Sequence, residues 1–227
     1  MRYQVALLAA LAVLSSGCQS DPRLARLNPF FRPDRTSFAT PAERAANVRE
    51  IADKSTGQDT PEQRELVEQL VETLASENDP LIRQAALESA AAFRTPLSEK
   101  ALIAALKDND PHVRRTGCRL LGDRGAADAV DALAAVAQSD DSFDVRVAAA
   151  RSLGRVGAPK ERLLPLLQDP NPAMQLAGVE AMRRTTGRDL GGDVSAYVAL
   201  AQGAEPPADA EDRTSVANRL PDWIPFF

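Results

Sequence analysis

The sequence predicts an all-α protein, an α-solenoid of about four to five helical hairpins with a flexible N-terminal tether and C-terminal tail. A five-residue motif starts at residues 79, 110, 142 and 171, at intervals of 31, 32 and 29 residues, and reads DPLIR, DPHVR, SFDVR and NPAMQ. A period between about 20 and 50 residues is typical of stacked supersecondary units. Between the copies, apolar residues recur at three- and four-residue steps, which indicates one helix face, and no comparable run alternates with a period of two.

The first 17 residues have the pattern of a signal peptide. Arg2 supplies a positive charge, residues 5–14 form an apolar run, and residues 15–17 are small. The apolar run is too short to span about 30 Å of hydrocarbon. Cys18 follows directly, so residues 1–18 resemble a bacterial lipoprotein signal, with Ser15 where that family usually has Leu. The resemblance implies lipidation of Cys18; an ordinary signal peptide with a free or cleaved cysteine is the alternative.

The same resemblance implies a lipid-anchored protein that faces the periplasm. In this family an Asp after the cysteine retains the protein in the inner membrane, so Gln19 favours the outer membrane. Removal of residues 1–17 would take away one Arg and leave 26 basic and 32 acidic residues, a formal charge of −6. Because nucleic-acid binding usually requires a basic stripe and a high isoelectric point, we expect no nucleic-acid partner.

Residues 18–39 are predicted to form a tether, because they contain three prolines and no helical period. Phe30 and Phe31 are unusual in a plain linker and could dock on the first repeat or elsewhere. Helical patterning begins at Thr40, where Pro follows and Glu43 completes a capping box. We therefore predict a solenoid over residues 40–184.

Each predicted unit has two helices. The first carries a Leu-rich stripe, and the second begins at the repeated motif, where Pro presets the helix start and an acid faces the positive end of the helix dipole. The predicted inward positions of the second helices form three rows. They are Ile82, Val113, Val145 and Met174; Ala86, Gly117, Ala149 and Gly178; and Ala90, Leu121, Leu153 and Met182. Gly122 and Gly154 are expected to end their helices in the left-handed conformation.

The motif at residues 110–114, followed by small residues and by Leu121 and Gly122, resembles the short HEAT-like repeat. The resemblance covers roughly residues 64–184. It implies stacked helical hairpins that present a binding surface and house no reaction centre.

The chain after residue 184 departs from the repeat. Residues 185–202 could form a capping helix region, and residues 203–227 are predicted to be a flexible tail with an apolar terminus. The terminus contains Trp223, Phe226 and Phe227. It could fold back over the end of the solenoid, or it could dock on a partner or at a membrane interface.

Catalytic chemistry has few candidate residues. His112 is the only histidine, and besides Cys18 the only cysteine is Cys118, which we expect to be buried and inert. A catalytic triad or a His-rich metal cluster cannot be built from these residues. HEAT-like repeats also occur in deoxyhypusine hydroxylase, but its iron-binding His-Glu pairs are missing here. We therefore expect the protein to have no enzymatic activity, no cofactor and no metal. The hypothesis of a phycobilin-lyase-like or other enzyme accessory is the one that the residues favour least.

The arginines of the motif, Arg83, Arg114 and Arg146, could form a ligand-binding ladder. The structural interpretation is stronger: each arginine pairs with a helix-cap aspartate, such as Asp79 or Asp110, of its own or the next unit.

The second helices are expected to line the concave side of the solenoid, and their outward residues follow from the inward ones. One row is Gln84, Arg115, Val147 and Leu176, the next is Glu88, Arg119, Arg151 and Glu180, and Arg155 and Arg183 extend them. The middle is basic, with an apolar strip at Val147 and Leu176. This pattern favours recognition of an acidic or extended peptide; a solvated face of mixed charge is the alternative.

Taken together, the sequence favours a non-catalytic protein–protein interaction scaffold that is lipid-anchored in the bacterial envelope. Its partner is an unidentified protein, with no small-molecule substrate expected. The alternative function is a structural subunit of an envelope complex, docked through its aromatic termini.

Overall fold

The computed structural model describes residues 39–205, and its regular elements in this range are all helical. The α-helices are α3 (Pro41–Arg49), α4 (Pro61–Ser76), α5 (Pro80–Ala92), α6 (Pro96–Ala104), α7 (Pro111–Arg124), α8 (Val130–Ser139), α9 (Phe143–Arg155), α10 (Lys160–Leu167), α11 (Pro172–Thr186) and α12 (Val194–Ala201). Short 3₁₀ segments, η1 (Glu50–Lys54), η2 (Ala105–Lys107) and η3 (Ala127–Ala129), adjoin α3, α6 and α8. The predicted all-α solenoid is confirmed. Cys18, Phe30, Phe31 and the aromatic terminus lie outside the described residues.

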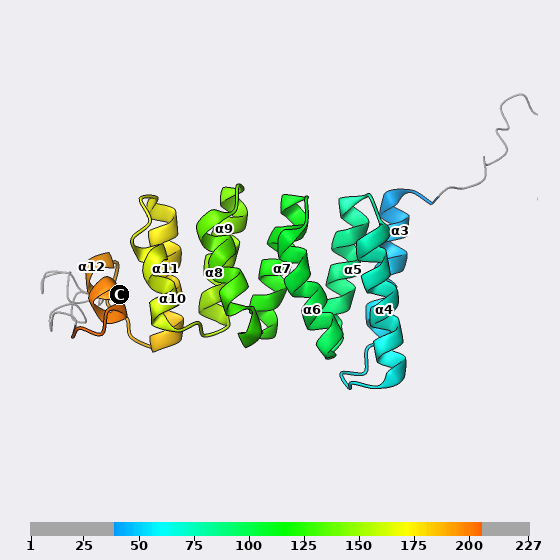
Figure 1. The fold of residues 1–227 in the computed structure, drawn as a ribbon, viewed down its shortest axis with the longest axis horizontal. Coiled ribbons are helices and arrows are strands. Elements are labelled where there is room, and N and C mark those ends of the chain that lie inside the picture. The colour runs from blue at the N-terminus through cyan, green and yellow to red at the C-terminus, as the bar shows by residue number, and fades with distance from the viewer. Residues whose placement is uncertain (1–38, 206–227) are drawn as a thin grey trace, which may run out of the picture. The chain divides into compact units, whose positions relative to one another are not determined.

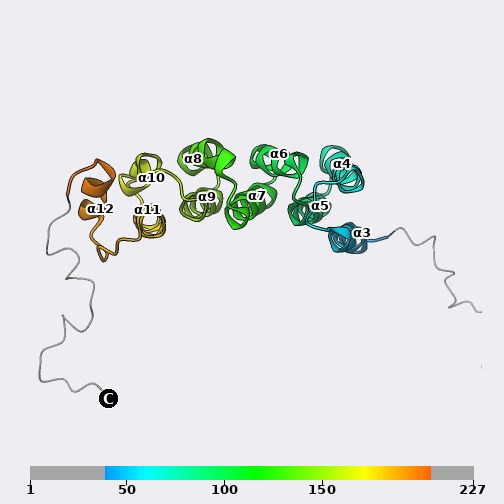
Figure 2. The same cartoon turned by 90° about the horizontal axis from the view of Figure 1, so that it is seen from below.

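The helices of the described unit follow one another in chain order along a single stack (Figure 1). Helices α4, α6, α8 and α10 form the first layer, and α3, α5, α7, α9 and α11 form the second (Figure 2). Successive second-layer helices contact one another along the stack. Four complete hairpins result, α4–α5, α6–α7, α8–α9 and α10–α11, with α3 before them and α12 packed on α10 and α11.

The second-layer helices begin where the repeated motif predicts. The side chains of Asp79, Asp110 and Asn171 each accept a hydrogen bond from the backbone N–H two residues on, at 2.9, 2.8 and 2.9 Å. Pro occupies the first turn of each of these helices. Ser142, which precedes Phe143 in the third copy, makes no such capping bond. The capping bond is therefore missing in the copy that has Ser-Phe in place of Asp-Pro, and it is kept in the copy that has Asn-Pro.

The core follows the three predicted rows. Ile82, Val113, Val145 and Met174 are at most 1% exposed, and the second and third rows are buried as well. Each row faces the first layer or the neighbouring hairpin, so the apolar surface is buried by stacking, as a repeat architecture requires. The prediction of the inward face is confirmed.

The predicted helix ends at Gly122 and Gly154 are wrong. Helix α7 continues to Arg124 and ends at Gly125, which has a φ of 70°. Helix α9 continues to Arg155, and the left-handed glycine after it is Gly157. The two predicted glycines lie inside their helices and are buried.

Gly122 and Gly154 are instead points of close contact between neighbouring second-layer helices. A Cβ atom on Gly122 would lie 2.7 Å from the Oγ atom of Ser152. On Gly154 it would lie 2.6 Å from the Cα atom of Ala181. Both distances are too short for real atoms, so these glycines set the spacing between repeats. The repeat pattern alone does not distinguish this role from a helix end.

Within residues 39–205, no helix combines the length and the apolar character needed to cross a bilayer.

Replacement of Gly154 by Ala tests the close approach. The added methyl group meets the backbone of α11 and not the end of a flexible side chain, so a whole helix has to move. Overpacking costs about 1–3 kcal/mol, whereas Gly→Ala in a helix interior gains up to about 1 kcal/mol. We expect a net loss of about 1–2 kcal/mol in the free energy of unfolding, measured by urea denaturation. Gly192→Ala is the control, because nothing lies within 4 Å of its added Cβ; a Gly154→Ala variant as stable as this control would contradict the packing role.

Candidate functional site

A groove of about 460 Å³ lies on the second layer, across α5, α7 and α9. Its lining residues are Gln84, Glu88, Arg115, Thr116, Arg119, Ala148, Arg151, Ser152 and Arg155. Arg115, Arg119, Arg151 and Arg155 were singled out from helix spacing, and the structure brings all four to this hollow.

A second hollow, of about 240 Å³, shares Arg151 and Arg155 with the first. It adds Glu180, Ala181 and Arg184 from α11. We call the two hollows together the basic groove. Arg184 was missed in the sequence, although its place four residues after Glu180 puts it on the same helix face.

Arg183, which was expected to extend this surface, has a different role. Its side chain donates to the Tyr197 hydroxyl at 3.3 Å and to the Gly191 carbonyl at 3.1 Å. It also pairs with Asp189 at 2.6 Å. Arg183 therefore ties α11 to α12 and to the loop before it.

Within the described part of the chain, three ion pairs engage arginines of the basic groove, and all three lie at the surface. The Asp123 carboxylate forms ion pairs with Arg155 at 3.0 Å and with Arg119 at 3.2 Å, so it binds two guanidinium groups from neighbouring helices. Arg151 and Glu180 are 3.9 Å apart, with 58% and 46% of their side chains exposed. Exposed pairs of this kind are weak, and an incoming acidic group can replace them.

Positive charge is in excess in the basic groove. The acid at one flank, Glu88, is already held by Arg49 of α3 at 2.9 Å and by Gln84 at 3.1 Å. Arg115 is exposed, and it makes no ion pair with any residue in the 39–205 range. The groove can therefore offer several guanidinium groups to a ligand.

The predicted apolar strip beside the groove does not form. Leu176 is 57% exposed, but Val147 is partly buried and packs against the core. Neither residue lines the basic groove.

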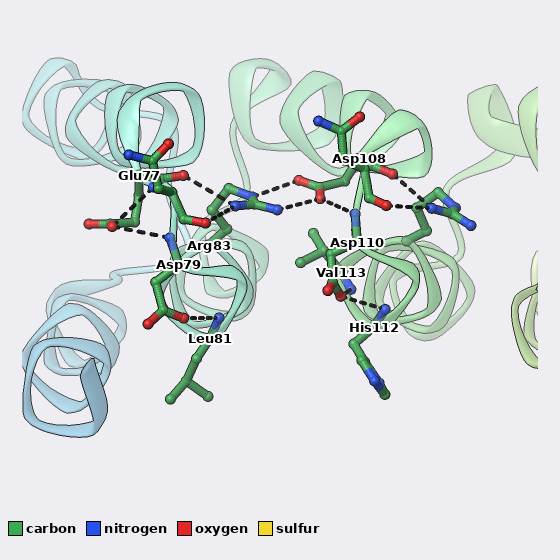
Figure 3. Close-up of polar contacts among 11 residues, drawn as sticks. Glu77, Asp79, Leu81, Arg83, Asp108, Asp110, His112 and Val113 are labelled. Carbon is green, nitrogen blue, oxygen red and sulfur yellow. Dashed lines mark hydrogen bonds and ion pairs between the residues drawn. The ribbon is translucent and has the colours of Figure 1, made fainter. Parts of the chain in front are cut away.

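Two of the motif arginines, Arg83 and Arg114, lie away from this groove and form contacts between repeats, as Figure 3 shows for Arg83. Arg83 donates to both carboxylate oxygens of Asp108, from Nε at 2.9 Å and from Nη2 at 2.7 Å. Its Nη1 atom donates to the carbonyls of Glu77 at 3.2 Å and Asn78 at 2.9 Å. The two side chains are only 13% and 14% exposed. One guanidinium thus joins the loop of its own hairpin to the loop of the next.

Arg114 repeats this arrangement with Asp140. Its Nε and Nη2 atoms donate to the carboxylate at 2.7 and 2.8 Å. Its Nη1 atom donates to the carbonyls of Asp108 at 2.9 Å and Asn109 at 3.2 Å. We call this arrangement the Arg–Asp joint.

The carboxylate partner differs from the one predicted. Asp79 and Asp110 cap their helices, and the joint uses the acid two residues before the cap. Asp108 also accepts the backbone N–H of Asp110 at 2.8 Å, and Asp140 accepts that of Ser142 at 2.8 Å. The capping oxygens face the helix end, so they are not free to meet the arginine of the previous repeat.

The series of joints starts earlier and ends sooner than predicted. Arg44 of α3 holds the equivalent helix position and pairs with Glu77; the signal is Pro41 three residues before it, as in the later copies. Arg146 has no carboxylate partner among the described residues, and its guanidinium lies 5.2 Å from the Phe143 ring centre. The side chain of Gln175 donates to the carbonyl of Asp169, at 2.8 Å, and carries no charge for a joint.

Both joint carboxylates are held ionised. Burial raises the pKa of Asp108, but the hydrogen bonds from Arg83 and from the Asp110 N–H outweigh it and leave the pKa below its ordinary value. The pKa of Asp140 is lowered in the same way, against the effect of burial, by Arg114 and the Ser142 N–H. The arginines of these joints are therefore committed to structure.

The remaining reactive side chains do not assemble into a site. His112 is exposed at the start of α7. Cys118 is fully buried, and burial raises its pKa to about 12, so it is a thiol at neutral pH. Among residues 39–205, no three His, Cys, Asp or Glu side chains come together as metal ligands.

Comparison with known families identifies the repeat. A family model described as HEAT repeats matches residues 67–154 and again residues 135–220. The two matches together run from residue 67 to residue 220 of the 227-residue chain. No curated protein matches the chain.

Replacement of Asp108 by Asn tests the Arg–Asp joint. The variant leaves the guanidinium of Arg83 mostly buried without its charged partner, so we expect a loss of about 2–3 kcal/mol in the free energy of unfolding, measured by urea denaturation. Asp59→Asn is the matched control, because Arg64 binds Asp59 through the same two-bond geometry at 2.8 and 2.8 Å on an exposed surface. We expect the control to unfold close to the wild type. Equal losses in the two variants would contradict a special role for the joint.

Proposed function

The chain belongs to the HEAT-repeat family, and we propose that it is a non-catalytic scaffold that binds a protein partner in the basic groove. HEAT repeats generally mediate protein–protein interactions, and the family is typically non-catalytic. The proposal is supported by the course of the groove, which crosses four consecutive second-layer helices, α5, α7, α9 and α11.

The observation that carries the proposal is the gathering of exposed arginines on one face of an acidic chain. Five arginines line the basic groove, although the chain has a formal charge of −5. They are Arg115, Arg119, Arg151, Arg155 and Arg184. Guanidinium groups bind carboxylates through paired, charge-assisted hydrogen bonds. The partner that fits is an extended acidic peptide segment of another protein.

Charge also favours specificity in this arrangement. The groove arginines come from α7, α9 and α11, so their spacing is set by the stacking of the repeats. A peptide with acidic side chains at matching intervals would engage several of them at once, and a basic segment would be repelled. The weak pairs with Asp123 and Glu180 would exchange for the carboxylates of the partner.

We further propose that this scaffold is lipid-anchored at Cys18 in the bacterial envelope and faces the periplasm, with the outer membrane favoured by Gln19. The support is the signal pattern of residues 1–18. Stable anchoring requires more than one acyl chain, which lipoprotein processing would supply. Residues 18–39 would then separate the repeats from the bilayer.

Charge reversal tests the groove. In a variant with Arg115, Arg119 and Arg151 all replaced by Glu, we expect recovery of a partner crosslinked in intact cells to fall at least about tenfold, because each charge-assisted hydrogen bond contributes about 1.5–3 kcal/mol. Arg162→Glu is the control, because Arg162 is a 54% exposed arginine of α10 in the first layer. Circular dichroism checks that helicity is unchanged in both variants.

Deletion of residues 214–227 distinguishes partner binding in the basic groove from the alternative, assembly through the aromatic termini. Loss of the partner in the deletion variant with full recovery in the charge-reversal variant would remove the groove proposal. Loss in the charge-reversal variant alone supports it.

Replacement of Cys18 by Ser tests the anchor. We expect the variant to lose metabolic labelling by a palmitate analogue and to leave the membrane fraction, because no acyl chain can then be attached. Cys118→Ala is the matched control and should keep both properties, since Cys118 is buried in α7. A Cys18→Ser variant that remains labelled and membrane-bound would refute lipidation at this position.

A further inference from the structure

A separate hollow of about 390 Å³ lies where the start of α6 meets the end of α7. Its lining residues are Arg94, Thr95, Pro96, Glu99, Lys100, Ile103, Arg124 and Asp128. We call it the α6–α7 hollow. It shares no residue with the basic groove, so an inference about it stands independently of the proposed function.

The buried side chain in this hollow is Arg124, and its hydrogen bonding is incomplete. Its side chain is only 9% exposed, and its nearest acid is Glu99, with Nε and Oε2 3.7 Å apart. Its Nη2 atom reaches the Thr95 carbonyl at 3.5 Å, and its buried Nη1 atom has no hydrogen-bond partner among the described residues. A guanidinium has five donors, and leaving one buried without a partner is costly.

The repeat itself does not require an arginine at this position. Arg124 lies 31 residues after Phe93 and 32 residues before Val156, which are the intervals between the motif copies. Phe93 is fully buried, and Val156 packs partly buried against the core. At this position the two neighbouring repeats therefore have an apolar residue, and the repeat that contains α7 has a charged one. Packing gives no reason for the exchange, since a poorly paired buried charge is unfavourable.

Two further cations flank Arg124. Arg94 and Lys100 are exposed side chains of the same hollow, and neither makes an ion pair with any other residue of the 39–205 segment. Burial lowers the pKa of Arg124, Glu99 raises it in part, and the charge of Arg94 lowers it further. Three cations thus share the hollow with two carboxylates, Glu99 and Asp128, so one positive charge is left without a counter-charge, and an anion would neutralise it.

We propose that the α6–α7 hollow binds a small oxyanion, a phosphate or carboxylate group, held by Arg94, Lys100 and Arg124. The oxyanion accepts charge-assisted hydrogen bonds from the three cationic side chains. Glu99 stays on the Nε side of Arg124, which leaves the Nη1 side for the ligand. Because Nη1 is shielded from solvent in the free protein, binding requires the guanidinium to turn toward the hollow.

The next repeat supplies an internal comparison. The corresponding hollow, at the end of α9 and the start of α8, is larger, at about 640 Å³. Val156 lines it in place of Arg124, together with Asp128 and Asp131. Its one cation, Arg162, pairs with Asp131 at 2.6 Å. Size alone therefore does not make an anion site, and we expect none there.

The test is the thermal stability of the full chain in inorganic phosphate, compared with sodium chloride at equal ionic strength. A ligand that binds only the folded state raises the melting temperature in a saturable way. Phosphate also stabilises proteins in general, so the difference between variants is the readout. We expect the wild type and Arg162→Gln to show a saturable rise that Arg124→Val lacks. Valine is chosen because it occupies this position in the next repeat.

The outcomes separate the proposal from its alternatives. A rise in Arg124→Val equal to that of the wild type, or no rise beyond sodium chloride in the wild type, would overturn the site. If Arg124→Val does not fold, the double variant Arg94→Gln/Lys100→Gln, changed only at exposed positions, has to lose the response. Acetate in place of phosphate distinguishes the source: a saturable response to acetate alone assigns a carboxylate ligand. Arg115→Gln has to keep the response, so failure of the basic groove would leave this site standing.

Discussion

The contact on which the described repeats depend is the Arg–Asp joint. Repeats in a solenoid touch only their neighbours, so the boundary between hairpins decides their relative position. At the boundary of α5 and α7, Arg83 binds the Asp108 carboxylate through two hydrogen bonds and two carbonyls of its own loop through two more. The geometry leaves little freedom to slide or rotate. Since the pair is mostly buried, it is also shielded from competition by solvent.

The fixed joints explain why two adjacent arginines have different roles, one in a contact between repeats and one in the basic groove. Arg114 is committed to Asp140, whereas Arg115, one residue on, lies exposed in the basic groove. A step of one residue turns about 100° around an α-helix, so one arginine faces the next loop and the other faces solvent. The joint holds α7 against α9, and the spacing of the groove arginines therefore follows from a contact outside the groove.

Boundaries between hairpins that lack an Arg–Asp joint are stabilised by other contacts. Between α9 and α11 the carboxylate pair is missing in the described residues, because Arg146 lies on the Phe143 ring. There the close approach of Gly154 to Ala181 brings the helices together. At the end of α7, Arg124 places a charge at a position where the neighbouring repeats have an apolar residue. Departures from the repeat thus mark either a substitute packing contact or a candidate ligand site.

Interactions between residues close together along the chain explain the features that could be predicted: the helical repeat, the caps at Asp79 and Asp110, and the buried rows. Capping and a 3.6-residue period involve residues a few positions apart. The same period placed the groove arginines on one helix face. Two features could not be predicted in this way: the pairing of Arg83 with Asp108, 25 residues away, and the close approach of α9 and α11 at Gly154. Those roles depend on distances between elements of different hairpins, and spacing along the chain does not encode them.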